Sequence, residues 1–133
     1  MATSYNDFML NLLKVAFNNL KQHEPFNRAE LSDIDTQFIE AFEQVVHNFD
    51  SMQGDRSQGE ALLSKLPIAY PDLVPLIPRD LFWYFGGSCL HYMPDDEIAV
   101  YQTLDEAMYE HETKGSSNNF NYEDMRAKAL GLN

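Results

Sequence analysis

Cys89 and His91 are the residues whose types and spacing come nearest to a catalytic pair. A nucleophilic thiol needs an imidazole close by to take its proton. On a helix, however, residues two apart point about 200° away from each other, so these two face each other only in a strand. Because no signature of a cysteine nucleophile surrounds Cys89, the sequence favours a small buried thiol. We predict no catalytic residue, and a protein that is not an enzyme.

Metal and nucleotide sites are the next chemical possibilities. Glu43 with His47, and Glu106 with Glu110, have the i, i+4 spacing of ligands on one helix face. A di-iron bundle needs a Glu-x-x-His pair on each of two helices, and the sequence has no such pair. The histidines also lack zinc-finger and H-E-x-x-H spacing. Because no phosphate-binding glycine motif is present either, we expect no metal and no cofactor.

The elements that must position these residues are predicted to be helices. Apolar residues recur at helical spacing along most of the chain. We therefore predict an all-α fold, a single compact domain over residues 1–133 with about five or six helices. A run of glycine, serine and asparagine at 115–120 is typical of a flexible linker before a short C-terminal helix. The predicted helices are residues 4–22, 33–52, 57–66, 79–92, 94–113 and 122–130.

The second predicted helix has the clearest apolar stripe, spaced by three and four residues, with Phe42 at its middle. We expect Gly54 to end this helix and Pro67 to end the next one. The prolines that follow predict an irregular apolar connector packed across the helices, because proline at this density excludes a regular helix. The stripe consists of Ile34, Phe38, Phe42, Val45, Phe49 and Met52, and the prolines are Pro67, Pro71, Pro75 and Pro78.

The stretch from Arg79 to Glu97 contains the single tryptophan, the single cysteine and the Gly86-Gly87 pair. Its aromatic run, Leu81–Phe85, is apolar on every side, which predicts a buried helix or one side kept for a partner. The two glycines predict either a break in this helix or the close approach of a neighbouring backbone or ring. The helix beyond Pro94 is either one helix or two, because Thr103 and Glu106 form a second capping-box pattern.

Charge is the most informative feature of the composition. The chain has 21 acidic and 9 basic residues, a formal net charge of −12. Phosphate repels such a chain, which argues against direct binding of nucleic acid or of anionic membranes. The sequence also has no apolar run long enough to span a membrane, no signal peptide and no possible internal disulfide. We therefore expect a cytoplasmic protein.

The acidic residues are concentrated where a partner could use them. Residues 95–112 have seven acids and no lysine or arginine, and residues 30–50 are also acidic. The first hypothesis is a non-enzymatic regulator or adaptor that binds a basic protein surface, with RNA polymerase or another nucleic-acid-binding protein as the class of target. The residues predicted to bind the partner are Asp95, Asp96, Glu97, Glu106, Glu110 and Trp83.

Two alternatives remain open. The second hypothesis is a small ligand-binding protein or enzyme with a pocket near Trp83, Gly86, Cys89 and His91. The third is a structural homodimer whose interface includes the aromatic run.

The stretch DLFWYFGGSCLHYMPDDEI and the C-terminal two-thirds around it resemble a small uncharacterised family of acidic proteins from gamma-proteobacteria. This resemblance implies a bacterial cytoplasmic setting and assigns no site residues.

Overall fold

The computed structural model describes residues 5–113 and 122–131. Within these ranges every regular element is a helix, which confirms the all-α prediction. The predicted linker at 115–120 and the predicted start of the first helix at Ser4 lie outside the described residues. The helices are α1 (Tyr5–Lys21), α2 (Asp33–Asp50), α3 (Arg56–Ala69), the 3₁₀ helix η1 (Pro71–Leu76), α4 (Arg79–Phe85), the 3₁₀ helix η2 (Gly87–Tyr92), α5 (Asp95–Thr113) and α6 (Tyr122–Leu130).

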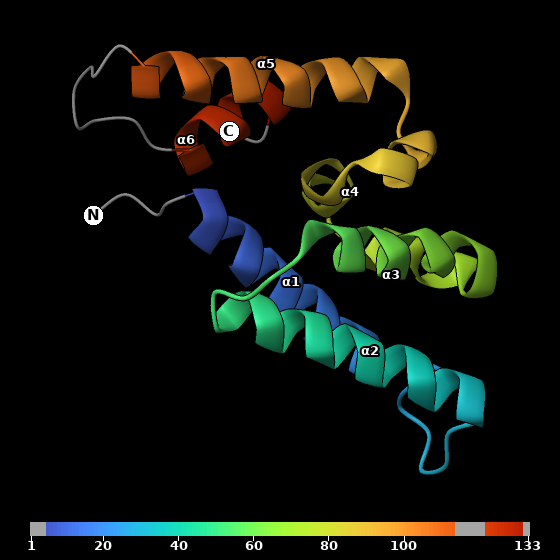
Figure 1. Ribbon diagram of the computed structural model, residues 1–133. Coiled ribbons are helices and arrows are strands. Elements are labelled where there is room, and N and C mark those ends of the chain that lie inside the picture. The colour runs from blue at the N-terminus through green and yellow to red at the C-terminus, as the bar shows by residue number, and fades with distance from the viewer. Residues whose placement is uncertain (1–4, 114–121, 132–133) are drawn as a thin grey trace.

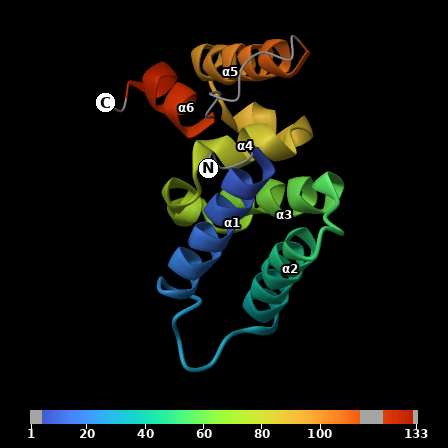
Figure 2. The ribbon, with the colours of Figure 1, turned by 90° about the vertical axis from the view of Figure 1, so that its left-hand side faces the viewer.

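The helices are arranged in layers along the length of the molecule. Both views place α5 and α6 at one end and α2 at the other, with α3 and α4 between them (Figures 1 and 2). Helix α1 packs against α2 and α4, and α3 packs against α2, η1, α4 and η2. The short α4 therefore lies at the centre of the fold, where Leu81 and Phe82 are fully buried. This burial agrees with the prediction that the aromatic run forms part of the core.

Helix α2 buries only the middle of its predicted stripe. Phe38, Phe42 and Val45 are buried, whereas Ile34 is 72% exposed and Met52 is 93% exposed. The helix ends at Asp50, capped by Ser51, so the prediction that Gly54 ends it is wrong. Met52 lies beyond the helix with a positive φ of 64°, which takes it off the helical face.

Pro67 lies inside α3, which continues to Ala69, so the prediction that it ends this helix is wrong. Pro67 has no N–H to donate to the carbonyl of Leu63, so α3 continues with one backbone hydrogen bond missing. The backbone N–H of Tyr70 still closes the last turn on the carbonyl of Leu66, 2.7 Å away. The same helix exposes Ala61 and buries its neighbours Leu62 and Leu63.

The proline-rich segment is more regular than predicted. Part of it completes α3, and residues 71–76 form η1, because a proline at the start of a 3₁₀ turn needs no N–H partner. It does pack across the helices, since η1 contacts α1 and α3 and buries Leu73.

Helix α5 is one continuous helix. The Thr103 hydroxyl donates to the Ala99 carbonyl inside it, so Thr103 does not begin a second helix.

The two glycines break the helix between α4 and η2. Gly86 has φ 67° and ψ −150°, a region almost confined to glycine, and Gly87 has φ 56°. The expected close approach of a backbone or ring is absent at Gly86, where a Cβ would lie 3.8 Å from the nearest atom. At Gly87 the close neighbour is the carboxylate of Glu60, 2.3 Å from a Cβ position. Positive φ therefore explains Gly86, whereas Gly87 combines a positive φ with the close approach of a side chain.

We predict that Gly86→Ala lowers the free energy of unfolding by about 1–3 kcal/mol, because alanine avoids this backbone region. Gly131→Ala is the control, since Gly131 also has a positive φ but nothing within 4 Å and lies at the end of α6. Urea denaturation of the two variants measures both effects. An equally small loss at both positions would contradict the special strain at Gly86.

Candidate functional site

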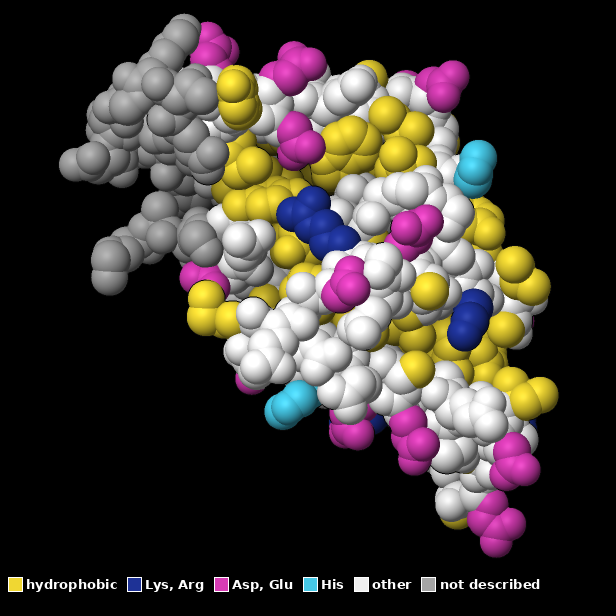
Figure 3. Space-filling model, viewed as in Figure 1, with side chains coloured by type: hydrophobic (Ala, Val, Ile, Leu, Met, Phe, Trp, Pro, Cys, Tyr) yellow, Lys and Arg dark blue, Asp and Glu magenta, His cyan; other side chains and the backbone are white. Residues whose placement is uncertain are grey.

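The acidic residues of α5 form one exposed strip. Asp95, Asp96, Glu106 and Glu110 are all exposed. At 100° per residue they fall within about 100° of arc, and at 1.5 Å per residue they extend over about 22 Å. We call these four residues the acidic strip. Figure 3 shows acidic side chains spaced along the upper edge of the molecule, over α5. Helix α5 contains no lysine or arginine.

Glu97, predicted to join the partner site, is already paired within the protein. Arg79 Nε and Nη2 donate to its Oε1 at 3.0 and 2.9 Å. Arg79 Nη2 also donates to the carbonyl of Tyr92, so this contact ties α4, η2 and α5 together. Because its charge is compensated, Glu97 adds little to the field of the acidic strip.

Trp83 is half-buried and serves as a contact between α4 and α5. Its indole Nε1 donates to Asp105 Oδ2 at 3.0 Å, and its ring stacks on Tyr101 with centroids 6.2 Å apart. Partial burial raises the pKa of the Asp105 carboxyl group, and the indole donor opposes this effect. Trp83 therefore fixes the orientation of α5 from below, on the side away from the acidic strip.

The residues proposed for a pocket do not come together as one. Cys89 is fully buried, with its Sγ 3.6 Å from the hydroxyl of Ser64, whereas His91 is exposed. Burial raises the pKa of the Cys89 thiol, which keeps it protonated and poorly nucleophilic. The most prominent hollows of the surface are lined by other residues, mostly of α1, α2 and α3.

Glu60 has a structural role beside the glycine pair. Its Oε2 accepts from the backbone N–H of Ser88 at 2.9 Å and from the Ser88 hydroxyl at 3.0 Å. These hydrogen bonds lower the pKa of the Glu60 carboxyl group. The Glu60 carboxylate thus accepts a hydrogen bond from a backbone N–H in the first turn of η2, where no side chain of η2 itself caps the backbone.

A buried ion pair connects α4 and α6, and sequence reasoning missed it. Asp80 is 1% exposed and accepts from Arg126 Nε at 2.6 Å and Nη2 at 2.9 Å. Such a two-pronged contact is the strongest form of side-chain ion pair. The only sequence signal was an acid next to an apolar run, which is too common to indicate burial.

The acids of α2 lie far from the acidic strip. Both views of the ribbon place α2 and α5 at opposite ends of the molecule (Figures 1 and 2). The expectation that the acidic side of residues 30–50 helps the same partner surface therefore requires a partner that extends along the whole molecule. The described residues include neither a group of side chains suited to a metal ion nor a helix long and apolar enough to cross a membrane.

The fold and this strip define a small all-helical domain with an acidic surface helix. The chain belongs to the PA2817-like family, whose model matches residues 1–133. No curated protein and no solved structure matches the chain.

Proposed function

We propose that this protein is a non-enzymatic regulator or adaptor that binds a basic surface of another protein through the acidic strip of α5. The observation that supports this proposal is the gathering of four exposed carboxylates on one side of a helix without lysine or arginine. Such a strip attracts a basic partner over a distance and fixes the register in which it binds.

The class of partner follows from the same charge. Basic protein surfaces are common on proteins that bind nucleic acid, so RNA polymerase or another nucleic-acid-handling protein of a bacterial cytoplasm is the proposed target. The net charge of −12 disfavours contact with the nucleic acid itself. We also propose a gamma-proteobacterial origin, which the resemblance of the central stretch implies.

The test compares the proteins that the wild type and a variant of the acidic strip capture from a bacterial lysate. Asp95→Asn and Asp96→Asn keep side chains that can cap α5, and Glu106→Lys and Glu110→Lys reverse the rest of the strip. We expect this variant to lose the basic proteins that the wild type captures at about 0.1 M salt. Capture by the wild type should fall as salt rises, because the screening length shortens from about 10 Å to about 3 Å at 1 M.

A control with the same change of charge separates the strip from overall acidity. Glu30→Gln, Asp72→Asn, Glu40→Lys and Glu43→Lys alter four exposed acids away from α5. This control should keep its partners. If both variants lose them equally, net charge rather than the acidic strip explains the binding, and if neither does, the proposal fails. Helical circular dichroism of both variants shows that they are folded.

A further inference from the structure

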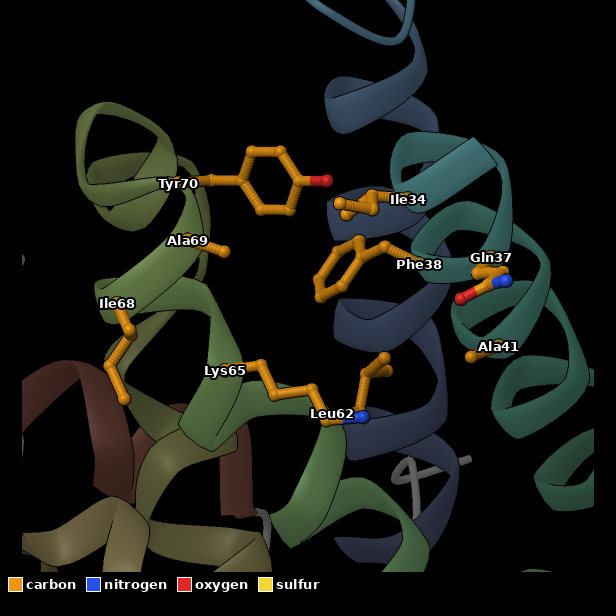
Figure 4. A pocket seen from close by; sticks show the side chains of 9 residues that line it. All are labelled: Ile34, Gln37, Phe38, Ala41, Leu62, Lys65, Ile68, Ala69 and Tyr70. Carbon is orange, nitrogen blue, oxygen red and sulfur yellow. The ribbon is translucent and has the colours of Figure 1, made fainter. Parts of the chain in front are cut away.

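An apolar hollow lies between α2 and α3, on a part of the surface distinct from the acidic strip. Its volume is about 250 Å³. Phe38 of α2 and Leu62 of α3, both buried, contribute to its wall, and Tyr70 closes one end. Figure 4 shows the rings of Tyr70 and Phe38 next to each other at one end of the hollow, with centroids 5.0 Å apart, and Lys65 extending from α3 toward α2.

Two aliphatic side chains line this hollow without being covered. Ile34 is 72% exposed and Ile68 is 79% exposed. Burying either isoleucine against an apolar ligand removes apolar surface from water, which favours binding. An apolar ligand in the hollow could therefore contact the exposed side chains of Ile34 and Ile68 in addition to the buried wall.

A second hollow of about 300 Å³ continues the first one along the same helices. The two share Ala41, Leu62 and Lys65, and the second adds the amides of Gln44 and Gln58. Lys65 therefore lies where the two hollows meet, and both hollows have mainly apolar linings. Together the two hollows have the volume of an ordinary small-ligand site, about 300–1,000 Å³.

The charges at the two ends of the first hollow differ in sign. Lys65 has no ion pair or hydrogen bond to another side chain within the described residues, although the protein as a whole is strongly acidic. At the far end the Tyr70 hydroxyl donates to Asp35 Oδ1, which leaves a carboxylate there. An anionic head group is attracted to the Lys65 end and repelled from the Tyr70 end.

We propose that this hollow binds an alkyl carboxylate of medium chain length. Its carboxylate pairs with Lys65, and its chain lies against Phe38, Leu62 and the two exposed isoleucines. An amphiphile of this kind matches both the apolar lining and the single cation. A second copy of this chain fits less well, because its net charge of −12 is repelled by the first copy far more strongly than the single charge of a carboxylate.

Calorimetric titration with octanoate and with octanol tests the proposal, since the two probes share a chain and differ in the head group. We expect the wild type to bind octanoate about tenfold more tightly than octanol, as a hydrogen bond to a charged group predicts. Lys65→Gln should remove this preference. Lys128→Gln, which changes the same charge on the exposed face of α6, should keep it.

Two further measurements locate the alkyl chain. Affinity should rise about fourfold with each added methylene until the hollow is full. Ala69→Trp, which places a ring at an exposed position of the lining, should weaken both probes at least tenfold without loss of helical circular dichroism. Neutralising the acidic strip should leave this binding unchanged, so the two proposals fail independently.

Several results would overturn the inference. Equal binding of octanoate and octanol by the wild type would show that Lys65 does not select the head group. An unchanged preference in Lys65→Gln, or unchanged binding in Ala69→Trp, would place any binding elsewhere. A dimer in sedimentation that dissociates in Ile34→Lys and Ile68→Lys would show instead that this hollow is an interface between two copies.

Discussion

Phe42→Ala is expected to lower the free energy of unfolding by about 3–5 kcal/mol. Phe42 is 0% exposed, and its ring stacks on Phe17 of α1 with centroids 5.5 Å apart and meets Phe38 edge-on. The substitution removes these contacts and leaves a cavity that a packed core fills only in part. Since α1 and α2 meet through this ring, the loss should affect the whole domain in a single transition.

Urea denaturation followed by circular dichroism measures this loss. Val15→Ala on α1 is the control, because Val15 is 51% exposed and its loss should stay within about 0.5 kcal/mol. A Phe42→Ala loss below about 1 kcal/mol would mean that the middle of the α2 stripe does not form the core.

Asp80→Asn is expected to cost about 3–5 kcal/mol, because it leaves the Arg126 guanidinium partly buried without its carboxylate. Arg126→Gln should cost a similar amount, since the Asp80 carboxylate is then buried without a cation. These losses measure the broken pair and not the contribution of an intact one.

The double replacement Asp80→Leu with Arg126→Met separates the two quantities. Apolar residues of similar volume remove both charges at once and should restore most of the stability lost by either single variant. The same denaturation experiment gives the coupling energy. A double variant as unstable as the sum of the singles would show that Asp80 and Arg126 act independently, contrary to their contact.

The sequence predicted the helical class because apolar spacing is set by the helix itself. Phe38, Phe42 and Val45 were found in the core as their spacing required. Ile34 has the same spacing but is exposed, because burial also depends on whether a neighbouring helix reaches that turn. The spacing of residues along α2 contains no information on where α3 ends. The hollow lies beside Ile34 because no neighbouring helix covers that turn of α2.

The helix ends were harder to predict. Pro67 lies inside α3 although it lacks the N–H of one backbone hydrogen bond, so the position of a single proline did not locate the end of this helix. The break at Gly86 was one of two predicted alternatives, and only backbone angles distinguish them.

The candidate site could also be predicted from the sequence only in part. Exposure of Asp95, Asp96, Glu106 and Glu110 follows from helical spacing on an amphipathic helix. The partners of Glu97 and Asp80 are residues 18 and 46 positions away in sequence, and long-range pairs of this kind leave no local pattern.

The contact between Trp83 and Asp105 has a practical consequence for observing this protein. The single tryptophan lies where α4 meets α5, and its indole donates to a carboxylate of α5. Its fluorescence emission therefore reports on the local polarity beneath the helix that has the acidic strip. A red-shifted spectrum would signal that α5 has moved away from α4 even while the helical content is unchanged. The intrinsic fluorescence of Trp83 therefore measures the position of α5 without an added label.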